Sequence, residues 1–220
     1  FYISIGQNSM HIYNSALSFT PQHTIFYETY FSKLEKSIKV LNGPSLQWST
    51  SAPIGEPLKG HKKGVTCVAF SPDGLKIVSG GEDGSLCLWN AKSGAAIGEP
   101  LNGHGNYIMC VAFSPDSSKF FVSGSYDQTH CLWDGKSGAA IGEPLKGHSE
   151  DVWCVAYSSD GSQIVSGSKD KTLRLWDGRS GASIGEPLTG HSGAVWCVVF
   201  SPDSLKFVSG SLDTTLCIWN

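Results

Sequence analysis

A sequence pattern with a period of 43 or 44 residues occurs four times in this chain of 220 residues, and it limits the possible folds more than any other feature. Each block opens with Gly-His, continues through Ser-Pro-Asp or Ser-Ser-Asp and Val-Ser-Gly, and reaches a Trp that Asp or Asn follows. The blocks begin at His61, His104, His148 and His191. Since repeated units bury their apolar surface against their neighbours, the sequence predicts four similar units packed one after another.

Each block has the pattern of four short β-strands. In the first block the expected strands cover residues 65–70, 76–80, 86–89 and 95–101. The first three are apolar at nearly every position, which is typical of strands covered on both faces. The fourth contains Pro100, which cannot donate a hydrogen bond to a neighbouring strand, so we expect it at a sheet edge. Four-stranded sheets stacked around an axis provide these environments, and the predicted fold class is therefore all-β.

The second block is one residue longer than the others. The extra residue lies in SPDSSKFFVSG (114–124), where the first block has SPDGLKIVSG (71–80). An insertion between two paired strands is expected either to lengthen the hairpin or to form a bulge.

Residues 60–220 resemble the WD40 repeat family in the motifs GH, SPDG, VSGSxDxT and LWD at this period. The resemblance implies a β-propeller of which four blades are present, as a partial, open arc. The repeats would cover 61–103, 104–147, 148–190 and 191–220, the last without its fourth strand, within a domain of residues 53–220. The departures are Asn90 and Asn220 in place of Asp, and Gly81 in place of the second Ser.

Four polar or aromatic positions recur in every block and form a candidate structural tetrad. The loop that connects the fourth strand of one block to the first strand of the next lies at the same end of the sheet as the turn between the second and third strands. We therefore expect His148 and Asp170 to lie side by side, although 22 residues separate them. In WD40 proteins such residues form a buried chain from Trp to Ser, Ser to His and His to Asp, and the donor and acceptor inventory permits it. The serine before Gly is chosen because it occurs in all four blocks. The predicted tetrads are His61, Ser79, Asp83 and Trp89; His104, Ser123, Asp127 and Trp133; His148, Ser166, Asp170 and Trp176; and His191, Ser209, Asp213 and Trp219.

The same His, Asp and Ser residues could also suggest a hydrolase. An active site is normally a single constellation, whereas these residues recur in every block, so we expect a structural role and no enzyme. GEPLKGHK (55–62) resembles a phosphate loop, but His61 stands where a Lys must reach the phosphates, and related stretches recur before each block. We therefore expect no catalytic residues, no cofactor and no metal site; no C-x-x-C pattern is present.

Amino-acid composition restricts the kinds of partner that we expect the protein to bind and the cellular compartment in which we expect it. The formal net charge of −3 argues against a nucleic-acid partner, and no apolar run is long enough for a membrane span. Seven cysteines without a secretory signal indicate reduced thiols and a cytoplasmic location. The chain starts with Phe1 rather than Met, so we expect a fragment of a longer protein. The cysteines occupy two repeat positions: Cys67, Cys110, Cys154 and Cys197 at one, and Cys87, Cys131 and Cys217 at the other, where the third block has Arg174.

Residues 1–52 differ from the repeats and are expected to form a helical junction and linker. Phe26, Tyr30, Leu34 and Ile38 are spaced four apart, as on one apolar helical face, with Thr20 as a possible cap. HIYNSALSFTPQH (11–23), this helix, a Trp-containing linker and the GEPLKGH repeats together resemble the junction in fungal NACHT-type signalling NTPases of the STAND class, which carry C-terminal WD40 repeats. A NACHT phosphate loop is not among these 220 residues, so ATP binding is not assigned to them.

The loops between blocks differ while the framework stays the same, which favours a recognition surface. In WD40 relatives, partners contact the top face at the residue before the tetrad Asp and at two positions beside the first residue of the first strand; here the latter include Gly64, Thr66, Met109 and Ala194. Trp153, Trp196 and Tyr126 are the expected anchors, although the two tryptophans could instead belong to the core. The partner-binding candidates are Glu82, Tyr107, Tyr126, Asp151, Trp153, Lys169, Trp196 and Leu212.

The function expected from these features is a non-catalytic protein-interaction scaffold, the sensing region of a fungal NACHT-type receptor. The alternative is a WD40 scaffold subunit of another multiprotein complex. Four blades are too few for the usual closure of this family, so we expect an open arc with two exposed sheet edges, which favour association. The strand-like residues 53–60, which lack a sheet of their own, could pair with a final blade, and the full-length chain could self-associate.

Overall fold

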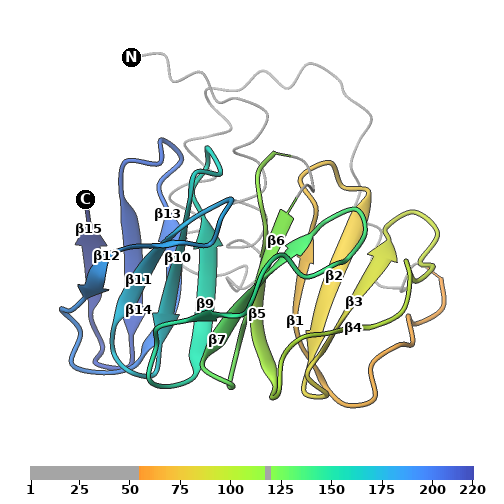
Figure 1. The fold of residues 1–220 in the computed structure, drawn as a ribbon, viewed down its shortest axis with the longest axis horizontal. Helices are drawn as coiled ribbons and strands as arrows, with labels where there is room; N and C mark the ends of the chain where they lie inside the picture. The colour runs from red at the N-terminus through yellow and green to blue at the C-terminus, as the bar shows by residue number, and fades with distance from the viewer. Residues whose placement is uncertain (1–54, 117–119) are drawn as a thin grey trace, which may run out of the picture. The chain divides into compact units, whose positions relative to one another are not determined.

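Within residues 55–116 and 120–220, which the computed structural model describes, the chain forms fifteen β-strands in four antiparallel sheets and no helix. Each sheet is called a blade here, and the blades are numbered in chain order. Figure 1 shows them following one another from the orange and yellow strands at one end to the blue strands at the other. The predicted all-β class is confirmed, whereas the predicted helix and the one-residue insertion fall outside the described residues.

Every blade uses its strands in sequence order, so that neighbouring strands in the chain are neighbours in the sheet. Blade 1 consists of β1 (Val65–Phe70), β2 (Lys76–Gly81), β3 (Ser85–Asn90) and β4 (Leu101–Asn102). Blade 2 consists of β5 (Ile108–Phe113), β6 (Phe120–Ser125), β7 (Thr129–Asp134) and β8 (Leu145–Lys146). Blade 3 consists of β9 (Val152–Tyr157), β10 (Gln163–Ser168), β11 (Leu173–Asp177) and β12 (Ser183–Leu188). Blade 4 consists of β13 (Val195–Phe200), β14 (Phe207–Ser211) and β15 (Leu216–Trp219).

The fourth strand lies at the sheet edge, as its proline predicts, but it is shorter than expected in blades 1 and 2. Pairing there is limited to β4 and β8, two residues each, and to isolated bridges from Trp89 to Ala96 and from Trp133 to Ala140. Pro100 and Pro144 stand directly before β4 and β8 and supply no N–H for pairing. In blade 3 the longer β12 includes Pro187, which the outer edge of a sheet tolerates.

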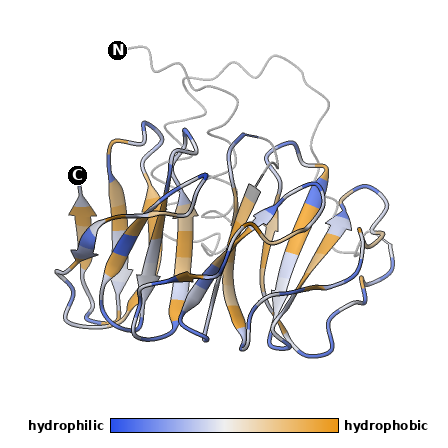
Figure 2. Ribbon diagram, in the orientation of Figure 1, coloured by the Kyte–Doolittle hydropathy of each residue, from blue (hydrophilic) through white to orange (hydrophobic). Residues whose placement is uncertain are grey.

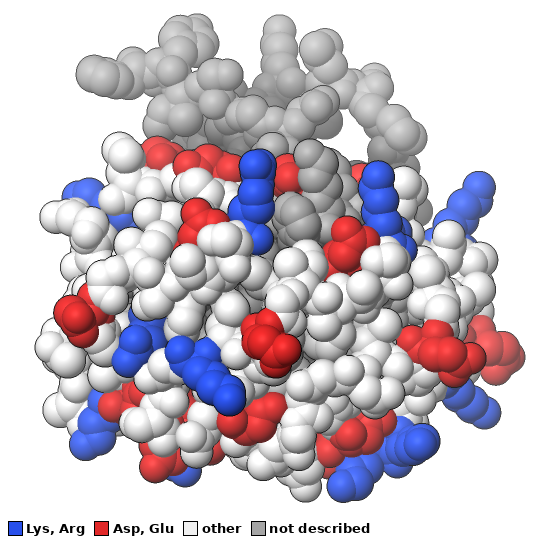
Figure 3. All heavy atoms as spheres, viewed as in Figure 1, with Lys and Arg blue, Asp and Glu red and all other residues white. Residues whose placement is uncertain are grey.

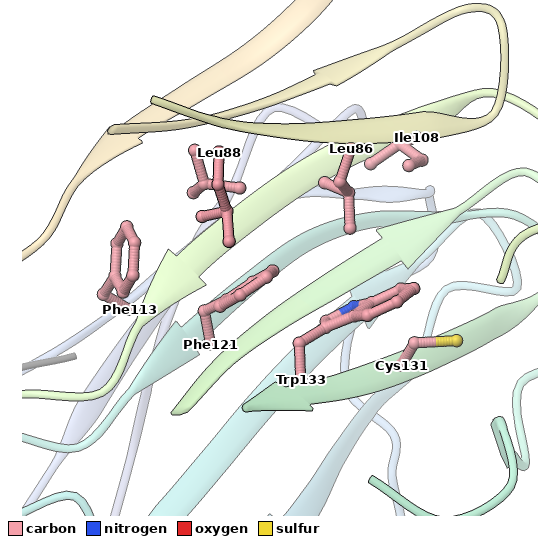
Figure 4. Close-up of a cluster of buried hydrophobic side chains, with 8 residues drawn as sticks. Leu86, Leu88, Ile108, Phe113, Phe121, Cys131 and Trp133 are labelled. Carbon is pink, nitrogen blue, oxygen red and sulfur yellow. The ribbon is translucent and has the colours of Figure 1, made fainter. Parts of the chain in front are cut away.

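The apolar core lies between the blades. Figure 4 shows the first such layer, in which Leu86 and Leu88 of blade 1 face Phe113, Phe121 and Trp133 of blade 2. The first strands β1, β5, β9 and β13 lie next to one another from blade to blade. Figure 2 shows apolar residues along the strands, and the clusters between neighbouring blades cover those of blades 2 and 3 on both faces, as their sequences predict.

A glycine of each blade forms a hole for a side chain of the next one. A Cβ on Gly80 would lie 2.7 Å from Ile108, and one on Gly124 would lie 2.7 Å from Val152. The third contact repeats the pattern, because a Cβ on Gly167 would lie 2.6 Å from Val195. Only glycine lets the backbones approach this closely, so the Gly of Val-Ser-Gly sets the spacing between blades.

The two end faces of the row are exposed. Phe70 in β1 is 62% exposed, although the equivalent Phe113 and Phe200 are buried. Leu216 in β15 is 73% exposed, although the equivalent Leu86 and Leu173 are fully buried. The difference arises because no described blade precedes blade 1 or follows blade 4.

The cysteines of the first strands also differ in burial from blade to blade. Cys154 is buried and Cys67 and Cys110 are partly buried, whereas Cys197 in the last blade is exposed. Burial, and then the neighbouring thiols Cys154 and Cys67, raise the pKa of Cys110 well above its ordinary value. Burial raises the pKa of Cys154 to about 12. All seven cysteines are free thiols.

Candidate functional site

The predicted tetrad of blade 3 is joined by hydrogen bonds from the blade interior to one end of the sheet. Trp176 on β11 donates its indole N–H to Ser166 Oγ on β10 at 2.9 Å. Ser166 Oγ lies 2.9 Å from His148 Nε2, and His148 Nδ1 lies 2.8 Å from an Asp170 carboxylate oxygen. The antiparallel strand order therefore brings together residues that are up to 28 positions apart in the sequence.

The chemistry of the four groups fixes the donor-to-acceptor direction of this series of hydrogen bonds. Indole can only donate and carboxylate can only accept, so the hydroxyl and the imidazole must relay between them. A neutral His148 with its proton on Nδ1 accepts from Ser166 and donates to Asp170. Every polar group of the tetrad then has a partner, which a buried network requires.

The same series of hydrogen bonds occurs in the other three blades. The distances from Trp to Ser, Ser to His and His to Asp are 2.8, 2.8 and 2.9 Å in blade 2 and 2.8, 2.8 and 3.0 Å in blade 4. In blade 1 they are 2.9, 2.7 and 3.2 Å. The structure thus brings together all sixteen residues assigned to tetrads, four in each blade.

A fifth residue, which sequence analysis did not assign, completes each tetrad. Thr172 donates its hydroxyl to Asp170 at 2.7 Å and its backbone N–H to the same carboxylate at 2.9 Å. Ser149 adds its backbone N–H at 3.0 Å. The equivalents of Thr172 are Ser85, Thr129 and Thr215. The spacing D-x-T, or D-x-S in the first block, was the available signal, because a hydroxyl two residues after Asp can bond back to it.

These hydrogen bonds determine the charge of the aspartates. Burial by itself raises the pKa of Asp170, but bonds from His148 and Thr172 outweigh it and hold the pKa well below its ordinary value. Asp83 and Asp127 show the same balance, and hydrogen bonding to Thr215 is the largest cause of the low pKa of Asp213. Each tetrad therefore ends on a charged carboxylate that is fully bonded.

The second serine of the VSGS motif has a separate role at the turn. In blade 3, Ser168 Oγ accepts the backbone N–H of Asp170 at 3.0 Å and donates to the Glu150 carbonyl at 3.2 Å. Blade 1 has Gly81 at this position, and a Cβ there would lie 2.6 Å from His61 Nδ1. Blade 1 thus closes its turn without this serine, and its His–Asp distance is the longest of the four.

The tetrads are poorly placed for catalysis. The side chains of His104, His148 and His191 have no exposed surface. Ser123, Ser166 and Ser209 are also fully buried, and each hydroxyl already bonds both Trp and His. A nucleophile must reach its substrate, whereas these hydroxyls face the blade interior.

The partner-binding candidates lie at the end of the sheets where the tetrad aspartates lie. Backbone hydrogen bonds of 2.8–3.0 Å join each residue before a tetrad Asp to the residue before β1, β5 or β13 or, in blade 3, before β9. The pairs are Glu82 with Gly64, Tyr126 with Tyr107, Lys169 with Asp151, and Leu212 with Ala194. We call these eight residues the rim.

The rim has a different chemistry on each blade. Tyr107 and Tyr126 of blade 2 stack with ring centroids 5.9 Å apart, and Lys63 Nζ lies 5.6 Å from the Tyr107 ring centroid. On blade 3, Lys169 Nζ lies 3.4 Å from the carboxylates of both Glu150 and Asp151. Figure 3 shows basic and acidic side chains interspersed over the face in view.

The two candidate tryptophans lie in different environments. Their rings meet edge to face with centroids 5.0 Å apart. Trp153 is half-buried, and its buried indole N–H has no partner among the described residues. Trp196 is 57% exposed, since no described blade follows blade 4. Met109 and Thr66 hold the equivalent positions in blades 2 and 1, and the Thr66 hydroxyl donates to the Ile108 carbonyl of the next blade.

One buried polar residue was not singled out from the sequence. His130 is 1% exposed and occupies the position of Leu86 and Leu173. Both of its ring nitrogens lack a hydrogen-bond partner among the described residues. Burial and then the nearby His148 lower the pKa of His130 to about 3. The imidazole is therefore neutral and packs as an apolar ring, with its centroid 5.1 Å from that of Trp176.

Comparison with known protein families identifies the family to which this chain belongs. The family described as WD domain, G-beta repeat (WD40) matches residues 52–90, 97–134, 141–177 and 182–220. The chain belongs to the WD40 repeat family. Its four blades and their tetrads are therefore WD40 repeats, and members of this family are typically non-enzymatic scaffolds for protein interactions.

Curated relatives share parts of these WD40 repeats. Vegetative incompatibility protein HET-E-1 of the fungus Podospora anserina is 42% identical over 90 residues, which are 41% of this chain and 6% of that protein. The mouse intraflagellar transport protein 122 homolog is 49% identical over 37 residues, 17% of this chain and 3% of that protein. The periodic tryptophan protein 2 homolog of Dictyostelium discoideum is 50% identical over 36 residues, 16% and 4% respectively. The matches thus span only a few per cent of each relative's length.

Residues 55–116 and 120–220 contain no group of three or more His, Cys, Asp or Glu side chains arranged to hold a metal ion. The same residues include no helix with the length and apolar character needed to cross a membrane.

Proposed function

We propose that the WD40 repeats of this chain form a non-catalytic recognition scaffold that binds a protein partner through the rim. The observation that carries the proposal is the contrast between framework and rim. Four tetrads repeat the same residues with nearly the same distances, while the paired rim positions change from acidic to aromatic to ion-paired to apolar. A constant scaffold with variable end loops is typical of binding surfaces.

The strongest binding energy is expected from the aromatic part of the rim and from Trp196 beside it. Tyr and Trp are enriched among residues that dominate protein interfaces. Tyr107 and Tyr126 already stack on each other, which reduces the side-chain entropy lost when a partner binds. The Lys169 cluster supplies charges that would set orientation and association rate more than affinity.

At a finer level, we propose that the chain is the sensing region of a fungal NACHT-type receptor located in the cytoplasm. The similarity to a fungal protein named for vegetative incompatibility and the NACHT-like junction sequence of residues 11–61 support this origin. The four blades would then be an open arc of a larger propeller. The alternative is a scaffold subunit of another complex, which the shorter matches to an intraflagellar transport protein and a periodic tryptophan protein favour.

The rim proposal is tested with the full-length protein in its native cells. We expect Tyr126→Ala and Lys169→Ala each to reduce capture of a specific partner at least tenfold without changing the thermal unfolding midpoint. Lys136→Ala is the matched control, because Lys136 is exposed but lies in the loop after β7, at the opposite end of the blade. Equal capture by all three variants would refute the rim as the binding face.

The receptor proposal has a separate test in the complete reading frame. A phosphate-loop sequence upstream, together with nucleotide binding by the full-length protein, would support the NACHT-type receptor. A complete reading frame without a nucleotide-binding domain would refute it and leave the scaffold subunit.

A further inference from the structure

We infer that a cavity on the outer flank of blade 2 is a binding site for an arginine side chain of a protein partner. The cavity has a volume of about 180 Å³ and lies between β7 and the segment that precedes β8. Blades 1 and 3 pack on the two faces of blade 2, so the cavity does not result from an uncovered end face. None of the eight rim residues lines it, and the inference therefore does not rest on partner binding at the rim.

The walls of the cavity combine an apolar surface with hydrogen-bond acceptors. The apolar part includes the side chains of Leu132 and Ile141. Glu143 also lines the cavity, and its carboxylate forms no hydrogen bond or ion pair with the residues that the structure describes. The carbonyl of Gly103 accepts only a weak donor there, the thiol of Cys131 at 3.9 Å, and it has a second lone pair for a stronger one. A side chain with an aliphatic stem and several N–H donors at its end fits such walls.

The charge of the cavity favours a cation. Among its lining residues only Glu143 and Cys131 carry ionisable side chains. Burial, and then the charge of Asp127, raise the pKa of the Cys131 thiol to about 12, so this thiol stays neutral. Glu143 therefore supplies the charge of the cavity, which is negative. A hydrogen bond between ionised partners is stronger than one between neutral groups, and a guanidinium can bind a carboxylate through two N–H groups.

Blade 3 holds an arginine of its own in the equivalent space. The residues that line the cavity in blade 2 recur in blade 3, except that Ser183 replaces Ala140 and Arg174 replaces Cys131. The guanidinium carbon of Arg174 lies 3.1 Å from where a Cβ on Gly147, the counterpart of Gly103, would be. The chain thus fills this space with an arginine side chain in blade 3 and leaves it open in blade 2.

Arg174 demonstrates the fit in size, whereas the ion pair requires an arginine that enters from the surface. Arg174 enters from β11 and forms no ion pair with Glu186, the counterpart of Glu143, within the described residues. Its buried Nε has no hydrogen-bond partner there either. An arginine of a partner approaches from the opposite side, so it can direct its N–H groups at Glu143 while its stem lies on the apolar wall.

The corresponding cavity of blade 1 has a different charge pattern. It is wider, about 340 Å³, and Glu99 lines it at the position of Glu143. Lys62 and Asp83 also line it. Asp83 is already bonded within its tetrad, and Lys62 brings an ammonium group to the same cavity as Glu99. This ammonium opposes a second cation, so we expect the arginine to bind in blade 2.

Titration of the purified full-length protein with N-acetyl-arginine amide, followed by NMR signals of the ligand, tests the inference. We expect saturable binding, and about tenfold weaker binding of the citrulline analogue, whose neutral urea group replaces the guanidinium. Equal binding of the two compounds would refute recognition of the charge. Free arginine should bind no more tightly than the capped compound. Tighter binding would make the free amino acid the ligand and overturn the assignment to a partner's side chain.

Exchange of residues between blades 2 and 3 locates the site. We expect Glu143→Gln to reduce the affinity about tenfold, because it removes the charged acceptor. Glu186→Gln is the matched control and should bind as the wild type does, because Arg174 fills the cavity beside it. Cys131→Arg copies blade 3 and should abolish binding in blade 2. The reverse substitution, Arg174→Cys, opens the cavity of blade 3 and should increase the amount of ligand bound at saturation.

Other outcomes would overturn the inference. Equal binding by the wild type and Glu143→Gln would refute the site, and this comparison decides the matter even where Cys131→Arg fails to fold. Loss of binding in Glu99→Gln, with Glu143→Gln unaffected, would move the site to blade 1 and refute the assignment. The rim variants Tyr126→Ala and Lys169→Ala should bind the arginine compound as the wild type does. Loss of binding in either variant would place the arginine at the rim instead of the flank.

Discussion

His130 shows how a single residue can depart from the pattern of its own repeat. Blades 1 and 3 place leucine at this position, under the next blade, and blade 2 places an imidazole there. The ring fits beside His148 and Trp176, with centroid distances of 5.6 and 5.1 Å, but its nitrogens have lost water without gaining a partner. A buried polar group without a hydrogen bond destabilises the folded state.

We therefore predict that His130→Leu stabilises the protein by about 1–2 kcal/mol, measured by urea unfolding at pH 7. The pH dependence should also change. The pKa of His130 falls from 6.5 to about 3 on folding, so between these values the unfolded chain binds a proton that the folded chain does not. Stability of the wild type should fall as pH drops below 6.5, and His130→Leu should remove that part of the slope. An unchanged slope would contradict this interpretation.

Replacing a tetrad histidine should destabilise the protein, in contrast to replacing His130. We predict that His148→Ala destabilises the protein by about 1–3 kcal/mol, because it leaves Ser166 and Asp170 without their shared partner. Chemical denaturation measures the loss, and Lys136→Ala provides a control that touches no tetrad. An unfolding midpoint equal to that of the wild type would show that the blade 3 tetrad does not support stability.

At the scale of elements, the glycine holes give a matched pair of substitutions. A Cβ on Gly124 would lie 2.8 Å from Cys110 Sγ and 2.7 Å from Val152 of the next blade, whereas one on Gly210 would meet the equivalent Cys197 Sγ at 2.8 Å and no following blade. We predict that Gly124→Ala costs about 1–3 kcal/mol more than Gly210→Ala in urea unfolding. Equal losses would place the strain inside the blade instead of between blades.

The strands show how far local sequence determines an element. The first expected strand, 65–70, has the observed bounds, because apolar β-branched residues and a turn sequence define it locally. The fourth strand was expected over 95–101 but forms mainly at Leu101–Asn102, because its pairing depends on Pro100 and on what the third strand offers. The helix expected around residues 21–41 and the edge near 53 stay predictions, since they lie outside the described residues.

At the scale of the whole molecule, repetition made the tetrads predictable. Four copies of His, Ser, Asp and Trp at constant spacing define a contact that a single copy would leave ambiguous, and the family match agrees with the repeats. The role of Thr172 could have been predicted from the D-x-T spacing, whereas the burial of His130 depends on three-dimensional neighbours that no spacing encodes. The exposure of Val65 and Leu216 depends on what surrounds the end blades, and the half-burial of Trp153 depends on its contact with Trp196.

The four tetrad aspartates also predict a response of the whole molecule to acid. Hydrogen bonds hold the pKa of each carboxyl below its ordinary value of 3.8, so near and below that pH the unfolded chain binds protons that the folded chain does not. The aspartates' contribution to stability should therefore be complete above about pH 5 and should fall as pH drops through 4 towards 2. Circular dichroism during acid titration measures this loss. A plateau of constant stability down to pH 2 would contradict it.

The cysteines of the first strands differ in exposure from blade to blade, so a thiol reagent can distinguish them. Thiols react as thiolates, so the buried Cys154 and the partly buried Cys110, whose pKa values are raised, should resist alkylation while the exposed Cys197 reacts readily. A maleimide dye added to the native protein would thus report on one end of the row of blades without any engineered residue.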